Sequence, residues 1–242
     1  MLTIKQLAIS RSTGKSMFRV CLPELMVKAG EVVVIKGDSG SGKSTLLEMI
    51  GMILKPDEVG YYNLFFDEQN VNITTLIKDN RIDQLTKIRS QYFGFMLQTG
   101  GLLPFLTIQD NVLLPFKLLQ KKIDIMRFDY LVDKLGISHL LSKYPKQLSI
   151  GERQRASFIR SIIHKPALLL ADEPTSALDP YNANLLFDLI IQQAQQDNIA
   201  AIIVTHDWQR IANKGLFTLS AQLTSPQSST FLPLQNKVDK DD

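Results

Sequence analysis

The chain has 242 residues, of which 45% are hydrophobic and 21% charged, with a formal net charge of +3. This composition is ordinary for a globular protein large enough to form a sizeable core, and it excludes a disordered or fibrous chain. The charge is too small and too evenly balanced to favour nucleic acid as a partner.

Membrane-spanning and secretory segments are not indicated by the sequence. The N-terminus lacks the basic stretch and apolar run of a secretory signal. The longest apolar region, 158–171, is interrupted by Arg160 and His164 and falls short of the roughly 20 apolar residues that a membrane helix needs. The single cysteine, Cys21, excludes an intramolecular disulfide. We therefore expect a soluble chain, in which any transport pathway belongs to another protein.

Strand and helix patterns alternate along most of the chain. Short apolar, β-branched runs bounded by glycine or proline predict buried strands, and apolar residues three and four apart predict helices. This alternation favours an α/β fold with a mostly parallel sheet covered on both faces. The expected elements are a strand at 31–36, a loop at 37–42, a helix at 43–53, strands at 61–66, 91–98 and 167–171, a helix at 184–197 and a strand at 199–205.

Between about residues 99 and 163 the pattern becomes mostly helical. Apolar side chains recur at helical spacing from Phe128 to Leu135, and Gly136 predicts the end of that helix. This region therefore looks like a helical insertion in an α/β core. The expected organisation is one domain, 1–223, with core segments 1–98 and 164–223, a helical subdomain at about 99–163 and a polar C-terminal tail at 224–242.

The segment GDSGSGKS at 37–44 matches the phosphate-binding loop pattern G-x-x-x-x-G-K-[ST]. Glycines allow backbone N–H groups to turn toward phosphates, and the following helix directs its positive end at the same anion. Lys43 is expected to reach the β- and γ-phosphates, and the Ser44 hydroxyl to hold Mg²⁺. The predicted nucleotide-binding residues of this segment are Gly37, Asp38, Ser39, Gly40, Ser41, Gly42, Lys43, Ser44 and Thr45.

An apolar strand at 168–171 ends in two acidic residues, Asp172 and Glu173. Carboxylates at the tip of a buried strand are well placed to act on a metal ion and a water molecule. Asp172 is expected to hold Mg²⁺, and Glu173 to polarise the attacking water as general base. An acidic strand end alone is commonly just solvated, but together with the phosphate-binding loop it predicts hydrolysis of ATP.

The segment LSIGERQR at 148–155 resembles the signature of the ATP-binding cassette (ABC) proteins, whose consensus is LSGGQ or LSGGE. Gln98 resembles the family's Q-loop glutamine, Ser176–Asp179 its D-loop, and His206 its switch histidine. All of these elements follow one another in the family's order. The resemblance implies an α/β P-loop NTPase core of the RecA-like, ABC ATPase type, with an antiparallel β subdomain and a helical insertion.

The same resemblance implies that two copies of the chain close over two ATP molecules. Ser149, Gly151 and Asp179 of one copy would then face the nucleotide held by the other. The implied catalytic residues are Glu173, His206, Gln98 and Lys43, and the implied Mg²⁺ ligands are Ser44, Gln98 and Asp172. A separate membrane permease would be the partner, with this chain peripheral on the cytoplasmic face of the inner membrane.

Two positions depart from the family pattern. Ile150 replaces the first glycine of the signature, and its backbone N–H can still point to a nucleotide if its φ angle is negative. Arg11 stands where the family usually has an aromatic residue that stacks on adenine. A guanidinium can also stack on a base, so Arg11 remains a candidate nucleotide contact.

The segments GFMLQ at 94–98 and GLLPFLT at 101–107 resemble the branch of lipoprotein-releasing, macrolide-exporting and cell-division ABC ATPases. Small-solute importers share much of this pattern. Two alternatives remain open: a non-transport ABC ATPase acting in DNA repair, chromosome organisation or translation, and a weakly active regulatory cassette. The DNA-linked class usually carries long coiled coils or zinc-binding cysteines, which this sequence lacks.

Overall fold

The structure is a computed structural model that describes residues 1–13, 16–66, 69–207, 211 and 214–234. Its strands are β1 (Leu2–Thr13), β2 (Ser16–Val27), β3 (Val32–Lys36), β4 (Glu58–Phe66), β5 (Gln69–Asn72), β6 (Phe93–Met96), β7 (Leu168–Asp172), β8 (Ala200–Val204), β9 (Phe217–Ser225) and β10 (Ser228–Pro233). Its α-helices are α1 (Lys43–Ile50), α2 (Ile73–Lys78), α3 (Ile82–Tyr92), α4 (Ile108–Leu119), α5 (Ile125–Lys134), α6 (Ile150–Ile162) and α7 (Pro180–Gln196).

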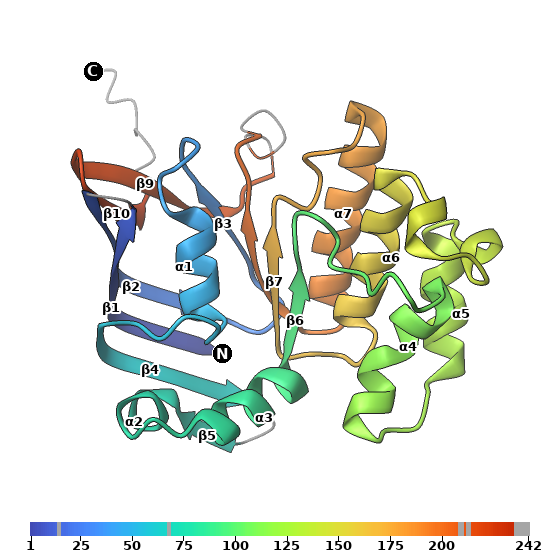
Figure 1. Cartoon of the computed structure of the whole chain (residues 1–242), viewed down its shortest axis with the longest axis horizontal. Helices are drawn as coiled ribbons and strands as arrows, with labels where there is room; N and C mark the ends of the chain where they lie inside the picture. The colour runs from blue at the N-terminus through green and yellow to red at the C-terminus, as the bar shows by residue number, and fades with distance from the viewer. Residues whose placement is uncertain (14–15, 67–68, 208–210, 212–213, 235–242) are drawn as a thin grey trace.

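The described strands form one curled sheet in the order β5-β4-β1-β2-β10-β9-β3-β8-β7-β6. From β9 to β6 all neighbours are parallel, whereas β1, β2, β4 and β5 pair in antiparallel fashion. The predicted α/β class, with a parallel core and an antiparallel β subdomain, is therefore confirmed. Figure 1 shows α1 between the antiparallel strands and the parallel strands, and α4 to α7 on the opposite side of the parallel strands.

Alternating side chains of the parallel strands contribute to two separate hydrophobic cores. In β3, Val33 and Ile35 face the core under α1, while Val32 and Val34 face the core under the helical layer. Because successive side chains of a strand point to opposite faces, a fully apolar strand indicates a sheet that is covered on both sides. The apolar runs predicted a sheet covered on both faces, and this prediction is confirmed.

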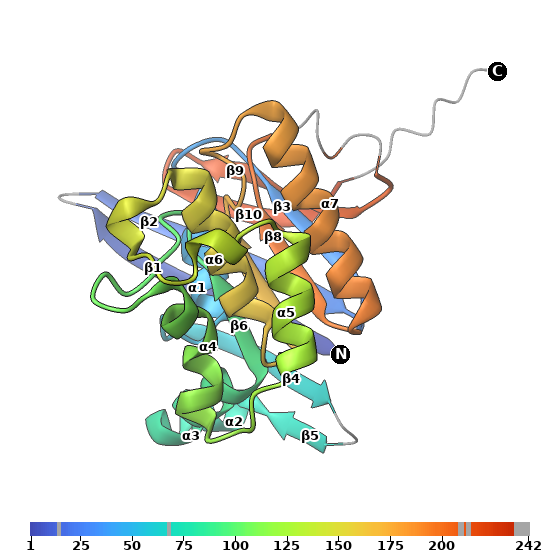
Figure 2. The same ribbon diagram turned by 90° about the vertical axis from the view of Figure 1, so that its right-hand side faces the viewer.

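A largely buried arginine holds the helices of the helical layer together. Arg127 of α5 makes a bidentate ion pair with Asp197, at 2.8 and 3.0 Å, beyond the end of α7. Its guanidinium also donates to the carbonyl oxygens of Ile162 and Ile163 at the end of α6. One side chain thus holds the C-terminal ends of two helices together and satisfies carbonyls that have no partner within their own helix. Figure 2 shows α5, α6 and α7 side by side.

Several predicted boundaries need correction. The first helix ends at Ile50 rather than residue 53, and residues 91 and 92 belong to α3, not to the following strand. The expected tail from residue 224 begins too early, because β10 pairs with β9 and β2. Phe231 is completely buried there, which explains why this polar segment joins the sheet. Residues 235–242 lie outside the described part of the chain.

The helix stop at Gly136 is confirmed: α5 ends two residues earlier, and Gly136 has a φ of 62°, a conformation that favours glycine. In the part of the chain that the structure describes, no helix combines the length and the apolar character that crossing a bilayer requires.

A buried histidine at the end of α6 makes stability depend on pH. His164 is 8% exposed, and both of its ring nitrogens are buried. Burial lowers the pKa of His164 to about 4; a hydrogen bond with the backbone of Phe93 opposes this shift only in part, and the positive charges of Lys121 and Arg127 add to it. Below the ordinary histidine pKa of about 6.5, the unfolded chain binds a proton that the folded chain excludes, so the folded state loses stability as the pH falls toward 4.

We expect the free energy of unfolding to fall by about 2 kcal/mol from this residue alone between pH 7 and pH 5. Urea titrations at both pH values measure this loss. In His164→Leu the unfolding free energy should fall by about 2 kcal/mol less than in the wild type. An equal loss in the two proteins would contradict the assignment of the proton to His164.

Candidate functional site

The phosphate-binding loop connects β3 to α1, as its sequence predicts. Gly42 has a φ of 89°, and a Cβ atom there would lie 2.5 Å from a methyl group of Val20, so glycine is required for both reasons. The loop is also held from the far end of the chain. The Ser229 hydroxyl of β10 donates a buried hydrogen bond of 2.7 Å to the carbonyl oxygen of Ser41.

Lys43 is the first residue of α1 and is 8% exposed. Its ammonium group donates hydrogen bonds of 2.8 Å to the carbonyl oxygens of Gly37 and Asp38. The positive charge therefore lies inside the curve of the loop, on the same side as the N-terminus of α1. Both features create a positive potential where an anion would be held.

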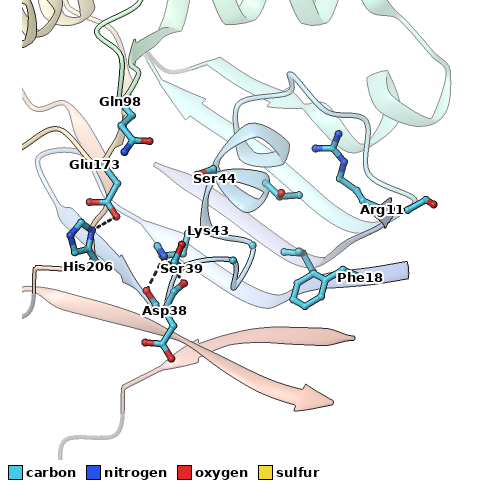
Figure 3. Close-up of a pocket in the computed structure, with 15 residues that line it drawn as sticks. Arg11, Phe18, Asp38, Ser39, Lys43, Ser44, Gln98, Glu173 and His206 are labelled. Atoms are coloured by element: carbon cyan, nitrogen blue, oxygen red, sulfur yellow. Dashed lines mark hydrogen bonds and ion pairs between the residues drawn. The ribbon is translucent and has the colours of Figure 1, made fainter. Parts of the chain in front are cut away.

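A cavity of about 1150 Å³ opens in front of this loop. Its described lining brings together most of the residues that we predicted from separate motifs. Figure 3 shows Gln98, Glu173 and His206 on one side of Lys43, and Arg11 and Phe18 on the other. The predicted residues among the lining are Arg11, Gly37, Asp38, Ser39, Gly40, Gly42, Lys43, Ser44, Thr45, Gln98, Glu173 and His206.

Glu173 and His206 meet although 33 residues separate them. The Oε1 atom of Glu173 lies 2.8 Å from Nδ1 of His206. Glu173 is 9% exposed and has a φ of 48°, the left-handed conformation, immediately after β7. Such a backbone is costly for a residue other than glycine and occurs most often at functional sites. It turns the carboxylate from the strand end toward the cavity.

Two predicted residues, Ser41 and Asp172, are not among the described residues that line the cavity. Ser41 is buried beneath the loop, and Asp172, the last residue of β7, does not belong to the described lining. The Oδ1 atom of Asp172 is buried and has no hydrogen-bond partner among the described residues. A buried carboxylate oxygen in this situation fits a cation or an ordered water molecule.

Ser149, Gly151 and Asp179 do not reach the cavity of their own chain. Ser149 caps α6 and forms a capping box with Glu152, three residues ahead: Glu152 N–H donates to the Ser149 hydroxyl, and Ser149 N–H donates to the Glu152 carboxylate. The bond from Ser149 N–H lowers the pKa of the Glu152 carboxyl. Asp179 caps α7, with Pro180 as the first helical residue.

Ile150 is the first residue of α6, so its φ angle is negative and its N–H is directed out of the helix N-terminus. The condition under which this substitution keeps a backbone donor is therefore met. The side chain of Ile150 is 50% exposed. Next to it, a Cβ atom at Gly151 would lie 2.6 Å from Leu178, so the signature segment touches the D-loop segment of the same chain.

Sequence reasoning missed three lining residues, Ser12, Phe18 and Val20. It also missed Ser229, which supports the loop from β10. No local pattern marks these residues, because their positions depend on the pairing of β1 with β2 and of β2 with β10.

Comparison with known proteins agrees with this geometry. Residues 23–176 match the model of the family described as ABC transporter. The chain is 37% identical over 209 residues to the lipoprotein-releasing system ATP-binding protein LolD of Rickettsia felis, covering 85% of this chain and 88% of that one. It is 39% identical over 193 residues to the protein of the same name from Acinetobacter baylyi, covering 76% and 78% of the two chains.

A solved structure supports the same relationship. The ATP-binding cassette MJ0796, in a dimeric post-hydrolysis state bound to ADP and Pi, superposes with a TM-score of 0.75 and 30% identity, covering 91% of this chain and 94% of that one. Because the family model, the relatives and the fold all agree, the chain belongs to the ABC transporter family, in which it is an ATP-binding subunit with ATPase activity.

Proposed function

We propose that this chain binds ATP with Mg²⁺, closes as a dimer over two nucleotides, and uses hydrolysis to drive a separate membrane permease. The observation that carries the proposal is the single cavity that unites the phosphate-binding loop with Gln98 and the Glu173–His206 pair. The two LolD proteins support a permease of the lipoprotein-releasing kind as the partner.

In this proposal the phosphates lie in the loop formed by residues 37–45. Backbone N–H groups and the N-terminus of α1 hold them, and Lys43 moves from its carbonyl partners to the β- and γ-phosphates. Ser44, Gln98 and Asp172 would hold Mg²⁺, which would supply positive charge at the phosphate oxygens. The unpaired Oδ1 atom of Asp172 supports this assignment. Few protein ligands suffice, because Mg²⁺ keeps waters and phosphate oxygens in its coordination shell.

Glu173 acts as the general base that removes a proton from the attacking water. Its contact of 2.8 Å with His206 fixes the direction of the carboxylate. His206 also lines the cavity, where its second ring nitrogen would donate to the γ-phosphate. Gln98 lies in the turn two residues after β6 and lines the cavity. There it orients the water, so it is sensitive to whether a γ-phosphate is present.

The second half of each site comes from the other copy. Ser149 and Gly151 lie at the N-terminus of α6, away from the cavity of their own chain, and such a terminus favours an anion. Asp179 accepts N–H bonds from Tyr181 and Asn182, which place it rigidly at the start of α7. These residues complete a site when they face the nucleotide held by a partner copy.

We expect Gly151→Asp to abolish ATP hydrolysis, because its carboxylate would repel the γ-phosphate across the dimer. Phosphate release by the purified chain with its permease measures the effect. Gly151→Ala is the matched control, because it makes the same contact with Leu178 without adding charge and should retain most activity. Ile150→Gly should keep or raise activity. An active Gly151→Asp protein would mean that this segment does not meet nucleotide.

A groove beside the Q-loop is the proposed docking place of the permease. It is lined by Ile53, Thr86, Arg89, Ser90, Phe93, Phe95 and Leu97, next in sequence to Gln98. Large apolar side chains are exposed on the adjoining segment from 102 to 119, among them Phe105, which is 72% exposed. Clusters of exposed apolar residues are typical of interfaces. Docking here would couple Gln98 to the membrane subunit and keep the chain at the cytoplasmic face of the inner membrane.

We expect a cysteine at Ser90 or Phe105 to form disulfide crosslinks with cysteines in a short cytoplasmic helix of the permease. The background is Cys21→Ala, which removes the single native thiol. Lys5→Cys, on the exposed face of β1, is the control and should remain uncrosslinked. Crosslinks that instead map to the face from Ile4 to Val20 would contradict the docking place.

A further inference from the structure

Two side chains from neighbouring strands lie together at the end of the cavity opposite Glu173 and His206. Arg11 on β1 and Phe18 on β2 are directly opposed in the antiparallel register, and both line the cavity. Figure 3 shows them on the same side of Ser44. The Cβ atoms of directly opposed residues are about 5 Å apart and point to the same face of the sheet. The two side chains can therefore act as one surface.

The position of this pair follows from the pattern of the two strands. The preceding pairs on the same face, Leu7 with Leu22 and Ile9 with Val20, are buried in the core under α1. In the next pair Arg11 is exposed, while Phe18 packs against the edge of the same core and is half-buried at the cavity. Part of the Phe18 side chain is therefore left exposed where it lines the cavity.

Contacts of the two side chains place them beside the phosphate-binding loop and α1. A Cβ atom at Gly42 would lie 3.5 Å from the Cε1 atom of Phe18, so the ring adjoins the phosphate-binding loop. Arg11 Nη1 lies 4.0 Å from a carboxylate oxygen of Glu48 on α1, with both side chains about half exposed. A surface ion pair of this length is weak, and the guanidinium can turn to a ligand at little cost.

We propose that Arg11 and Phe18 form the base-stacking surface of the nucleotide site, and that this surface accepts guanine as well as adenine. The inference rests on the proposed function. In this site the aromatic residue that stacks on the base is on β2, facing Arg11. The family usually has that residue at the end of β1. A guanidinium plane and an aromatic ring both stack on a base.

Stacking uses the face of a base and ignores its edge, so it distinguishes poorly between purines. Adenine and guanine differ in the donors and acceptors on their edges. The other described lining residues at this end, Ser12 and Val20, supply one hydroxyl and one apolar side chain. This set is too small to build an edge-specific contact pattern. Affinity for the base therefore depends on stacking and is shared by both purines.

Binding of ADP and GDP to the full chain, measured by calorimetry with Mg²⁺, tests the inference without depending on hydrolysis. We expect the two dissociation constants to differ by less than about tenfold, because edge contacts are few. Phe18→Leu keeps an apolar side chain but removes the ring, and should weaken both nucleotides by about 5- to 150-fold. Arg11→Lys keeps the charge but removes the planar guanidinium, and should also weaken the binding of both nucleotides.

Two controls separate loss of stacking from loss of the fold. Inorganic tripolyphosphate has no base and should bind the wild type, Phe18→Leu and Arg11→Lys equally. Met17→Ala, on the opposite face of β2, should leave the affinity for both nucleotides unchanged.

The outcomes also separate this inference from the proposed function. A wild-type chain that binds neither ADP nor tripolyphosphate would contradict the proposed function itself. If both bind, the inference is overturned by unchanged nucleotide affinity in Phe18→Leu, or by GDP binding that is weaker than ADP binding by about tenfold or more. It is also overturned if Arg11→Lys weakens ADP and tripolyphosphate equally, since Arg11 would then contact phosphate rather than base.

Discussion

Glu173→Gln is expected to form a stable dimer with ATP and to hydrolyse it about 10²–10⁴-fold more slowly than the wild type. Glutamine keeps the size and hydrogen-bonding reach of the side chain, so it can still contact His206 at the 2.8 Å separation seen for Glu173. It cannot accept the proton of the attacking water. ATP therefore stays bound, and its γ-phosphate continues to join the loop of one copy to the α6 N-terminus of the other.

Light scattering and size-exclusion chromatography with ATP and with ADP measure the dimer. With ADP the α6 N-terminus loses its anion, so ADP should hold the two copies poorly. Wild type under turnover should contain little dimer. Glu58→Gln, an exposed carboxylate paired with Arg19, is the matched control and should behave like the wild type. A Glu173→Gln protein that stays monomeric with ATP and its permease would rule out the ATP-held dimer.

Lys43→Ala is expected to lower ATPase activity by at least about 10²–10³-fold and to weaken nucleotide binding. The charge of Lys43 is directed into the loop by two carbonyl oxygens, of Gly37 and Asp38, and no other described lysine lines the cavity. Its removal takes away the positive group nearest to the β- and γ-phosphates. Phosphate-release rates and the dissociation constant of ADP measure the two effects.

The matched control is Lys55→Ala, which removes a lysine whose ammonium bonds to Asn80 on an exposed surface. It should retain wild-type turnover and affinity. Thermal unfolding of both variants shows whether they are folded, because Lys43 also satisfies two loop carbonyls. Wild-type turnover in folded Lys43→Ala would show that the cavity is not the site of hydrolysis.

The sequence alone determined the features that depend on neighbours within a few residues. The glycine pattern around Lys43 specifies a loop whose backbone can surround phosphates, and that loop occurs where it was expected. The caps at Ser149 and Asp179 were also predictable, because each side chain bonds to N–H groups two or three residues ahead. Apolar runs such as 199–205 identified the buried strands for the same reason.

Tertiary structure decided which of these local features meet. Glu173 contacts His206 because β7 and β8 are parallel neighbours, so their C-terminal ends lie at one edge of the sheet. Phe18 reaches the cavity because the β1–β2 register places it opposite Arg11, and a shift by one residue would turn it to the other face. Ser229 supports the loop across 188 residues of sequence. Hydrophobic periodicity specifies how each strand is buried, but strand order and register depend on packing among distant segments, so these contacts could not be predicted from the sequence alone.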